Sequence, residues 1–153
     1  MTKPEFIKVK YRLSEQVIQP GGMTVELATG RAGRELGMQA EAGHKSIGET
    51  IGKLEVLCKA QTGPTDAIYD LSSVVLDVAG MFDRRTLCEA AYSLCELSDR
   101  LRTQNRQDWA SIQVHVNALR LIWAAPESEV EAMASMVQGL WVLTDRQRDP
   151  AAT

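Results

Sequence analysis

Residues 71–87 read LSSVVLDVAGMFDRRTL, and this stretch decides the fold. Before position 80 its apolar residues recur at intervals of three and four, which is the spacing of one helix face. A glycine at 80 and an aspartate at 83 interrupt the pattern, and a second helical pattern begins directly after them. The stretch therefore predicts two helices joined by a tight turn, one from about residue 65 to the turn and one over 84–104.

Helical patterns continue on both sides of this pair. Thr24 is placed to cap a helix that runs to about residue 61, and Asp108 is placed to cap another that ends at Pro126. A last helix is expected over 127–145. No strand pattern follows residue 13, so the predicted fold class is all-α: an antiparallel four-helix bundle with an additional C-terminal helix.

The two ends of the chain read differently from the bundle. Residues 7–13 alternate between apolar and basic side chains, which predicts an extended strand or a docking peptide, and the basic face is either solvated or an acidic-partner site. The expected organisation is an extended segment at 1–23, a glycine-rich helical extension at 24–45, a helical bundle at 46–145 and a polar tail at 146–153.

The glycine-rich helix is intrinsically weak. Glycines stand at positions 30, 33, 37, 43, 48 and 52, and each internal glycine costs up to about 1 kcal/mol relative to alanine. Its first half is therefore expected to be mobile, bent or formed only against a partner, whereas Ile47, Ile51, Leu54 and Cys58 give the second half a core-facing stripe. The glycine spacing also allows close helix crossing in a homodimer.

Composition and charge exclude several classes of protein. The 153 residues carry a net charge of −3, which makes a nucleic-acid backbone an unlikely main partner, and no apolar run is long enough to span a membrane. The N-terminus carries charged residues where a signal peptide would need an apolar stretch, so a cytoplasmic location is the default expectation. Cys58, Cys88 and Cys95 lie at no metal-ligand spacing and are expected to be reduced packing residues.

Chemical signatures are sparse. No phosphate-binding loop, zinc motif or nucleophile elbow occurs, so no cofactor and no metal are expected. His44 is expected on the solvated surface. His115 lies at the edge of an apolar helix face and is expected to be a partly buried structural residue, with phosphoacceptor or ligand as the alternative.

The central stretch resembles the histidine phosphotransfer (Hpt) family over about residues 46–123. In that family a helix with the pattern His-x-x-Lys-Gly-x-Ala-Gly-x-x-Gly turns tightly into a second helix. Aligning the turn at 79–82 places Ser73 at the histidine position, Leu76 at the lysine position and Asp77 at the first glycine, while Asp83 takes the last glycine. A serine without an adjacent base is a poor nucleophile, and leucine cannot neutralise a phosphoryl group.

The resemblance therefore implies a non-enzymatic module. It would be an adaptor of a two-component or chemotaxis pathway that binds a receiver domain or histidine kinase through the family's docking surface, here Ser73, Leu76, Asp77 and Arg84. Two alternatives stay open: an active phosphotransfer protein that uses His115 or His44, and a structural dimerisation protein.

The chain as a whole also resembles the alphaproteobacterial chemotaxis proteins called CheE. The residues that carry this resemblance are QPGGMT at 19–24, IGKLE at 51–55 and AYSLC at 91–95. The resemblance implies a small accessory protein of a chemotaxis system, which agrees with the adaptor reading.

Overall fold

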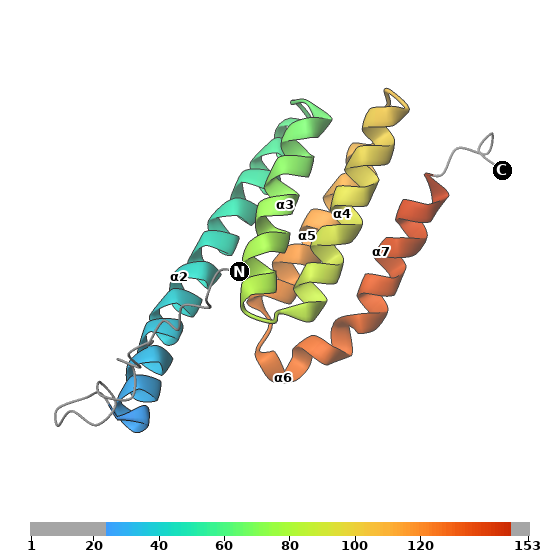
Figure 1. Cartoon of the computed structure of the whole chain (residues 1–153). Coiled ribbons are helices and arrows are strands. Elements are labelled where there is room, and N and C mark those ends of the chain that lie inside the picture. The colour runs from blue at the N-terminus through green and yellow to red at the C-terminus, as the bar shows by residue number, and fades with distance from the viewer. Residues whose placement is uncertain (1–23, 148–153) are drawn as a thin grey trace, which may run out of the picture. The chain divides into compact units, whose positions relative to one another are not determined.

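The structure is a computed structural model that describes residues 24–147 (Figure 1). Every regular element in this range is a helix, which confirms the predicted all-α class, and none of the described helices has the length and hydropathy to cross a bilayer. The extended segment expected at 1–23 lies outside the described residues, as does 148–153 of the expected tail. The chain divides into two units, Met1–Met38 and Gln39–Thr153.

Helix α2 (Val25–Ala60) begins at the predicted cap, where the hydroxyl of Thr24 accepts a backbone N–H at 3.2 Å. The described part of the first unit is the segment 24–38 of this chain, and every one of its side chains is exposed. The part of α2 in the second unit buries the predicted stripe, from Ile47 to Cys58. The two halves of the helix therefore differ in burial as their sequences predicted.

Helices α3 (Thr65–Met81) and α4 (Arg85–Thr103) are the predicted pair, within two residues at each end. They lie side by side (Figure 1). The turn between them is closed by a hydrogen bond from the Arg84 backbone N–H to the Ala79 carbonyl at 3.0 Å. Asp83 takes a φ of 54°, a left-handed conformation that aspartate tolerates better than most residues.

The C-terminal part of the bundle corrects one prediction. Helix α5 (Trp109–Ala124) is capped by Asp108 as predicted, but the single helix expected over 127–145 is broken into α6 (Glu127–Val130), a 3₁₀ turn η1 (Glu131–Met133) and α7 (Ala134–Arg146). In the broken arrangement α7 buries Val137, Leu140 and Thr144 against the rest of the second unit. The break turns the chain so that α7 packs along α4 and α5 (Figure 1).

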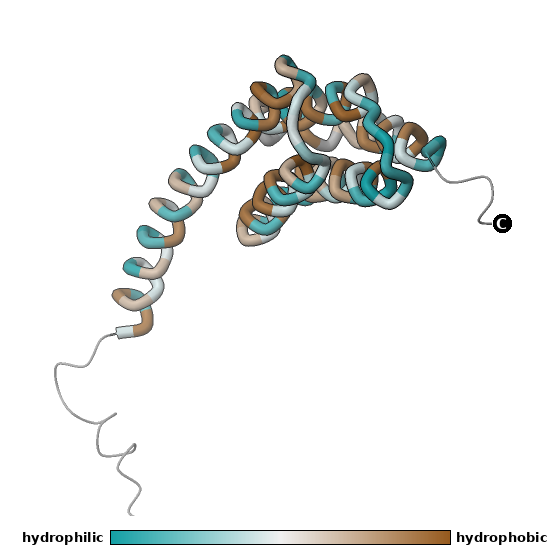
Figure 2. The backbone as a smooth tube through the Cα atoms, turned by 90° about the horizontal axis from the view of Figure 1, so that it is seen from above, coloured by the Kyte–Doolittle hydropathy of each residue, from teal (hydrophilic) through white to brown (hydrophobic). Residues whose placement is uncertain are grey.

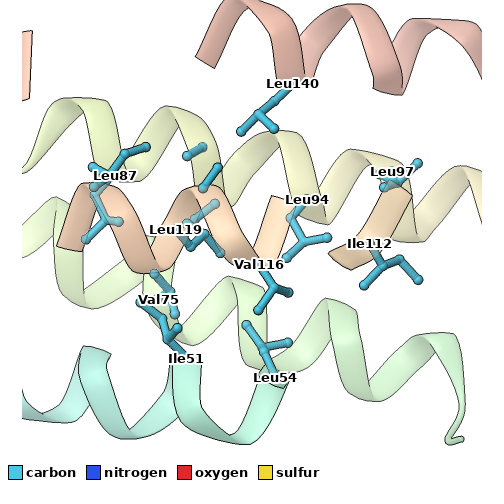
Figure 3. Packing of buried hydrophobic residues seen from close by; sticks show 14 of the residues in the cluster. Ile51, Leu54, Val75, Leu87, Leu94, Leu97, Ile112, Val116, Leu119 and Leu140 are labelled. Carbon is cyan, nitrogen blue, oxygen red and sulfur yellow. The ribbon is translucent and has the colours of Figure 1, made fainter. Parts of the chain in front are cut away.

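One hydrophobic core joins the helices of the second unit. Figure 3 shows Ile51 and Leu54 of α2, Val75 of α3, Leu94 of α4 and Val116 of α5 pointing toward one another. All five side chains are fully buried. Hydrophobic and hydrophilic residues alternate along the helix tubes (Figure 2), as the periodic sequence predicts for helices that bury one face.

Candidate functional site

The predicted docking residues on α3 lie within about one helical turn. Ser73, Leu76 and Asp77 are related by three- and four-residue spacings, so they share one side of the helix. Ser73 and Leu76 are half-buried and Asp77 is exposed. The Ser73 hydroxyl donates to the Asp70 carbonyl at 2.9 Å, and Leu76 packs against the core. The structure therefore brings these three residues together, with only Asp77 well exposed.

The fourth predicted docking residue, Arg84, lies outside α3. It precedes the first turn of α4 and lines a hollow of about 190 Å³ together with Leu87, Ile122 and Val130. Residues of α4, α5 and α6 line this hollow together with the turn before α4, and none of its described lining residues comes from α3. Sequence spacing alone could not give this orientation, because the backbone at Asp83 sets the direction in which α4 starts.

A row of exposed residues runs along α3 beside Ser73, and we call it the α3 stripe. It consists of Asp66, Asp70, Val74, Asp77 and Met81. Val74 is 43% and Met81 73% exposed, and Asp77 lies between them along the stripe. Helix α3 contains no lysine or arginine, although Arg102 of α4 reaches Asp66 at 3.4 Å. The stripe is thus an apolar and acidic surface, suited to a partner with an apolar and basic face.

His115 lies inside the protein, in a buried polar cluster with Ser93 of α4 and Thr144 of α7. The three side chains have no exposed surface. The Ser93 hydroxyl oxygen lies 3.1 Å from His115 Nε2 and 3.0 Å from Thr144 Oγ1, and Nε2 lies 3.2 Å from the same threonine oxygen. His115 Nδ1 lies 2.9 Å from the Ser111 carbonyl oxygen. The cluster therefore joins three helices by side-chain hydrogen bonds.

These contacts fix the protonation of the imidazole. A carbonyl oxygen can only accept, so Nδ1 carries the proton and donates to Ser111, while Nε2 accepts from a hydroxyl. Burial lowers the pKa of His115 against the opposing effect of the Ser111 hydrogen bond. A serine beside a histidine can be a nucleophile, but this pair has no access to a substrate. The cluster is structural, and its ring is not placed to meet a phosphoaspartate.

Further polar contacts hold the end of α7 against α4. Arg100 donates to the Thr144 carbonyl at 2.6 Å and pairs with Glu96 at 2.9 Å. The Gln104 side chain donates to the Gln147 carbonyl at 2.6 Å. Arg100 and Gln104 were not singled out from the sequence, because the carbonyl oxygens that they bond on α7 and just after it lie more than 40 positions away along the chain.

The second histidine, His44, is exposed on the part of α2 that belongs to the second unit. Its ring stacks on Trp123 of α5, with ring centroids 4.7 Å apart, and its backbone carbonyl accepts the indole N–H at 2.9 Å. Gly48 lies one turn further along α2, where an added Cβ would stand 2.5 Å from the same indole. An added Cβ at Gly43 would overlap the Phe82 ring in the same way. These two glycines therefore serve close packing within the chain and not a seam between copies.

An ion pair lies beside this contact. Arg120 donates from Nε and from a terminal nitrogen to the two carboxylate oxygens of Glu55, each at 2.7 Å, and its guanidinium lies 5.3 Å from the centre of the Trp123 ring. The Arg120 hydrogen bond lowers the pKa of Glu55, although burial opposes it. The half-buried, bidentate pair aligns α2 with α5.

The cysteines lie where packing residues are expected. Cys58 and Cys95 are buried, Cys88 is half-buried, and all three are free thiols. Burial raises the pKa of each thiol, to about 11 for Cys95, so all three are protonated at neutral pH and weakly nucleophilic. Among residues 24–147, no group of three or more histidine, cysteine or carboxylate side chains is arranged to hold a metal ion.

The buried imidazole predicts a pH dependence of stability. Because the pKa of His115 is lowered in the folded protein, the unfolded chain binds a proton first as the pH falls below its ordinary value of 6.5. The stabilising contribution of the neutral His115 ring is therefore fully present above pH 6.5. Below pH 6.5 the free energy of unfolding should fall by up to about 1.4 kcal/mol per pH unit. Urea unfolding at pH 7.5, 6.5 and 5.5 measures this slope. The variant His115→Gln should lose it, and an equal slope in both proteins would contradict the assignment.

Comparison with known proteins adds no relative. No family model matches the chain, and no curated protein or solved structure matches it significantly. The fold defines the chain as an all-helical protein whose second unit contains one hydrophobic core.

Proposed function

We propose that this chain is a cytoplasmic, non-catalytic adaptor of a two-component or chemotaxis pathway. In this proposal residues 39–60 of α2 form an antiparallel four-helix bundle of the phosphotransfer type with α3, α4 and α5. The bundle binds a receiver domain or a histidine kinase through the α3 stripe and the adjoining Ser73. The short connections between consecutive helices and the close pairing of α3 with α4 support this arrangement.

One observation carries the proposal. Val74 and Met81 leave apolar surface exposed on α3, beside the carboxylate of Asp77, where the resemblance to the phosphotransfer family predicts a docking surface. Exposed apolar side chains within a polar surround are typical of transient protein interfaces.

The same surface lacks the chemistry for phosphoryl transfer. The Ser73 hydroxyl donates to a backbone carbonyl, and the histidines of the chain lie on α2 and α5. The carboxylates of the stripe would repel a phosphoryl group. A bundle with this surface supports binding to a signalling partner without accepting its phosphate.

A binding measurement tests the docking surface. Immobilised full-length protein is titrated with the receiver domains and kinases of the source organism by biolayer interferometry. We expect at least one of them to bind, and Val74→Arg and Met81→Arg to weaken that binding by about tenfold or more. Val56→Arg is the matched control, since Val56 is an exposed valine on α2, 65% exposed. Absence of binding, or equal weakening by the control, would refute the docking surface.

A phosphorylation assay tests the absence of catalysis. After incubation with a phosphorylated kinase or receiver, we expect no acid-labile phosphate on the protein. Labelling that survives in Ser73→Ala and is lost in His44→Ala would instead establish the alternative, an active phosphotransfer protein with an exposed imidazole.

A further inference from the structure

Helices α5 and α7 leave an apolar groove on the surface of the second unit. The groove has a volume of about 370 Å³ and is lined by Val114, Ala118 and Leu121 of α5 and by Met136, Gly139 and Leu143 of α7. Ala118 is almost fully buried and lies deep in the groove, whereas Val114 is 46% and Leu121 54% exposed and stand at its rim. The surface thus offers both a hollow and protruding aliphatic side chains.

Gly139 keeps the α7 side of the groove open. An added Cβ at this position would meet nothing within 4 Å, so no contact within the described part of the chain accounts for the glycine. This distinguishes it from Gly43 and Gly48, whose places are taken by aromatic rings of the same chain. Val142, one turn beyond Gly139, is 53% exposed and extends the apolar surface.

The groove is also free of charge. Among the described residues that line it none is charged, and Asn117 contributes an amide. Helix α5 carries a single charged residue, Arg120, which is bonded to Glu55 of α2. The charged residues of α7, Asp145 and Arg146, are its last two. The exposed surface of α3, by contrast, carries carboxylates along its length.

We propose that this groove is the contact surface of a homodimer, in which the same α5–α7 face of a second copy covers it. In a two-fold contact a surface meets itself, so a charge that lies on the axis faces the like charge of its copy, and an uncharged surface avoids that repulsion. An uncharged face satisfies this condition. Selection of a peptide or a heterologous protein would be aided by complementary charges, and the residues that line this groove offer none.

The shape of the α5–α7 face also suits contact with a second copy of the chain. The rim side chain of Leu121 from one copy can enter the hollow above Gly139 of the other, and two-fold symmetry repeats the contact. Depletion of charge, a high apolar fraction and enrichment in Met are typical of the cores of homodimer interfaces. The α3 stripe lies on a helix that does not line the groove, so the dimer and the proposed docking of a signalling partner are independent of each other.

Sedimentation equilibrium of the full-length protein at 5–100 μM, roughly the range in which interfaces of this kind associate, tests the dimer. We expect the wild type to approach twice the monomer mass, and Leu121→Arg to raise the dimer dissociation constant by tenfold or more. Gly139→Gln, which fills the groove without a charge, should do the same. Circular dichroism melting identifies any variant that fails to fold.

Two controls make the result specific. Val56→Arg introduces the same charge at an exposed aliphatic residue of α2 and should leave the dimer unchanged. Leu36→Arg, at a residue of the glycine-rich segment that is 61% exposed, should also leave it unchanged. A monomeric wild type overturns the proposal. So does a dimer that survives both groove variants, or one that only Leu36→Arg dissociates, which would place the contact on the glycine-rich segment.

Discussion

Replacing His115 with alanine is expected to lower the free energy of unfolding by about 4 kcal/mol. The truncation removes a fully buried side chain and leaves a cavity among α4, α5 and α7. It also removes the partner of the Ser93 and Thr144 hydroxyls, which are buried and keep only their contact with each other and with the Ser93 carbonyl. Since a typical domain is stable by about 5–15 kcal/mol, the loss is a large fraction of the total.

The matched control is His44→Ala. Its ring is exposed and stacks on Trp123, so its removal should cost about 1 kcal/mol or less. Urea denaturation of both variants at pH 7.5 measures the difference. Equal stability of His115→Ala and the wild type would show that the imidazole is not held between the three helices.

This prediction affects how phosphorylation experiments are read. If His115→Ala is strongly destabilised, loss of phosphate label in that variant reports loss of folded protein. The labelled residue must then be identified directly on the wild-type protein, by mass spectrometry under conditions that preserve acid-labile phosphate. His44→Ala and Ser73→Ala, at residues with exposed surface, can be used as ordinary site variants.

The helices could be predicted from the sequence because their ends are marked locally. Thr24 and Asp108 cap their helices through their own side chains, and Pro126 ends α5 by its covalent structure. The break between α6 and α7 was missed because residues 127–145 contain neither glycine nor proline until Gly139, well inside α7. That break depends on packing against α4 and α5, which local sequence does not encode.

Some residues of the candidate site could likewise be grouped from the sequence, and others could not. Ser73, Leu76 and Asp77 could be placed together because a single helix fixes their spacing. The Ser93–His115–Thr144 cluster could not, since it draws one residue from each of three helices. Sequence suggested a structural role for the imidazole, and only the packing of α7 shows what it bonds to.

Replacing Gly48 with leucine is expected to lower the free energy of unfolding by about 3 kcal/mol, because the side chain would overlap an indole that is not free to move. Trp123 is held by its hydrogen bond to the His44 carbonyl, by stacking on the His44 ring and by the guanidinium of Arg120. In the matched control Gly30→Leu, nothing lies within 4 Å of the added Cβ, so the higher helix propensity of leucine should stabilise α2 by about 0.8 kcal/mol.

A double-mutant cycle separates overlap from any general intolerance of leucine at position 48. Trp123→Ala alone should destabilise the protein by removing its contacts with α2, but it also vacates the space that an added side chain at 48 would enter. The leucine should therefore cost much less in the Trp123→Ala background, with a coupling free energy of about 2 kcal/mol measured by urea denaturation. An equal cost in both backgrounds would mean that Gly48 is required for a reason other than the approach of α5.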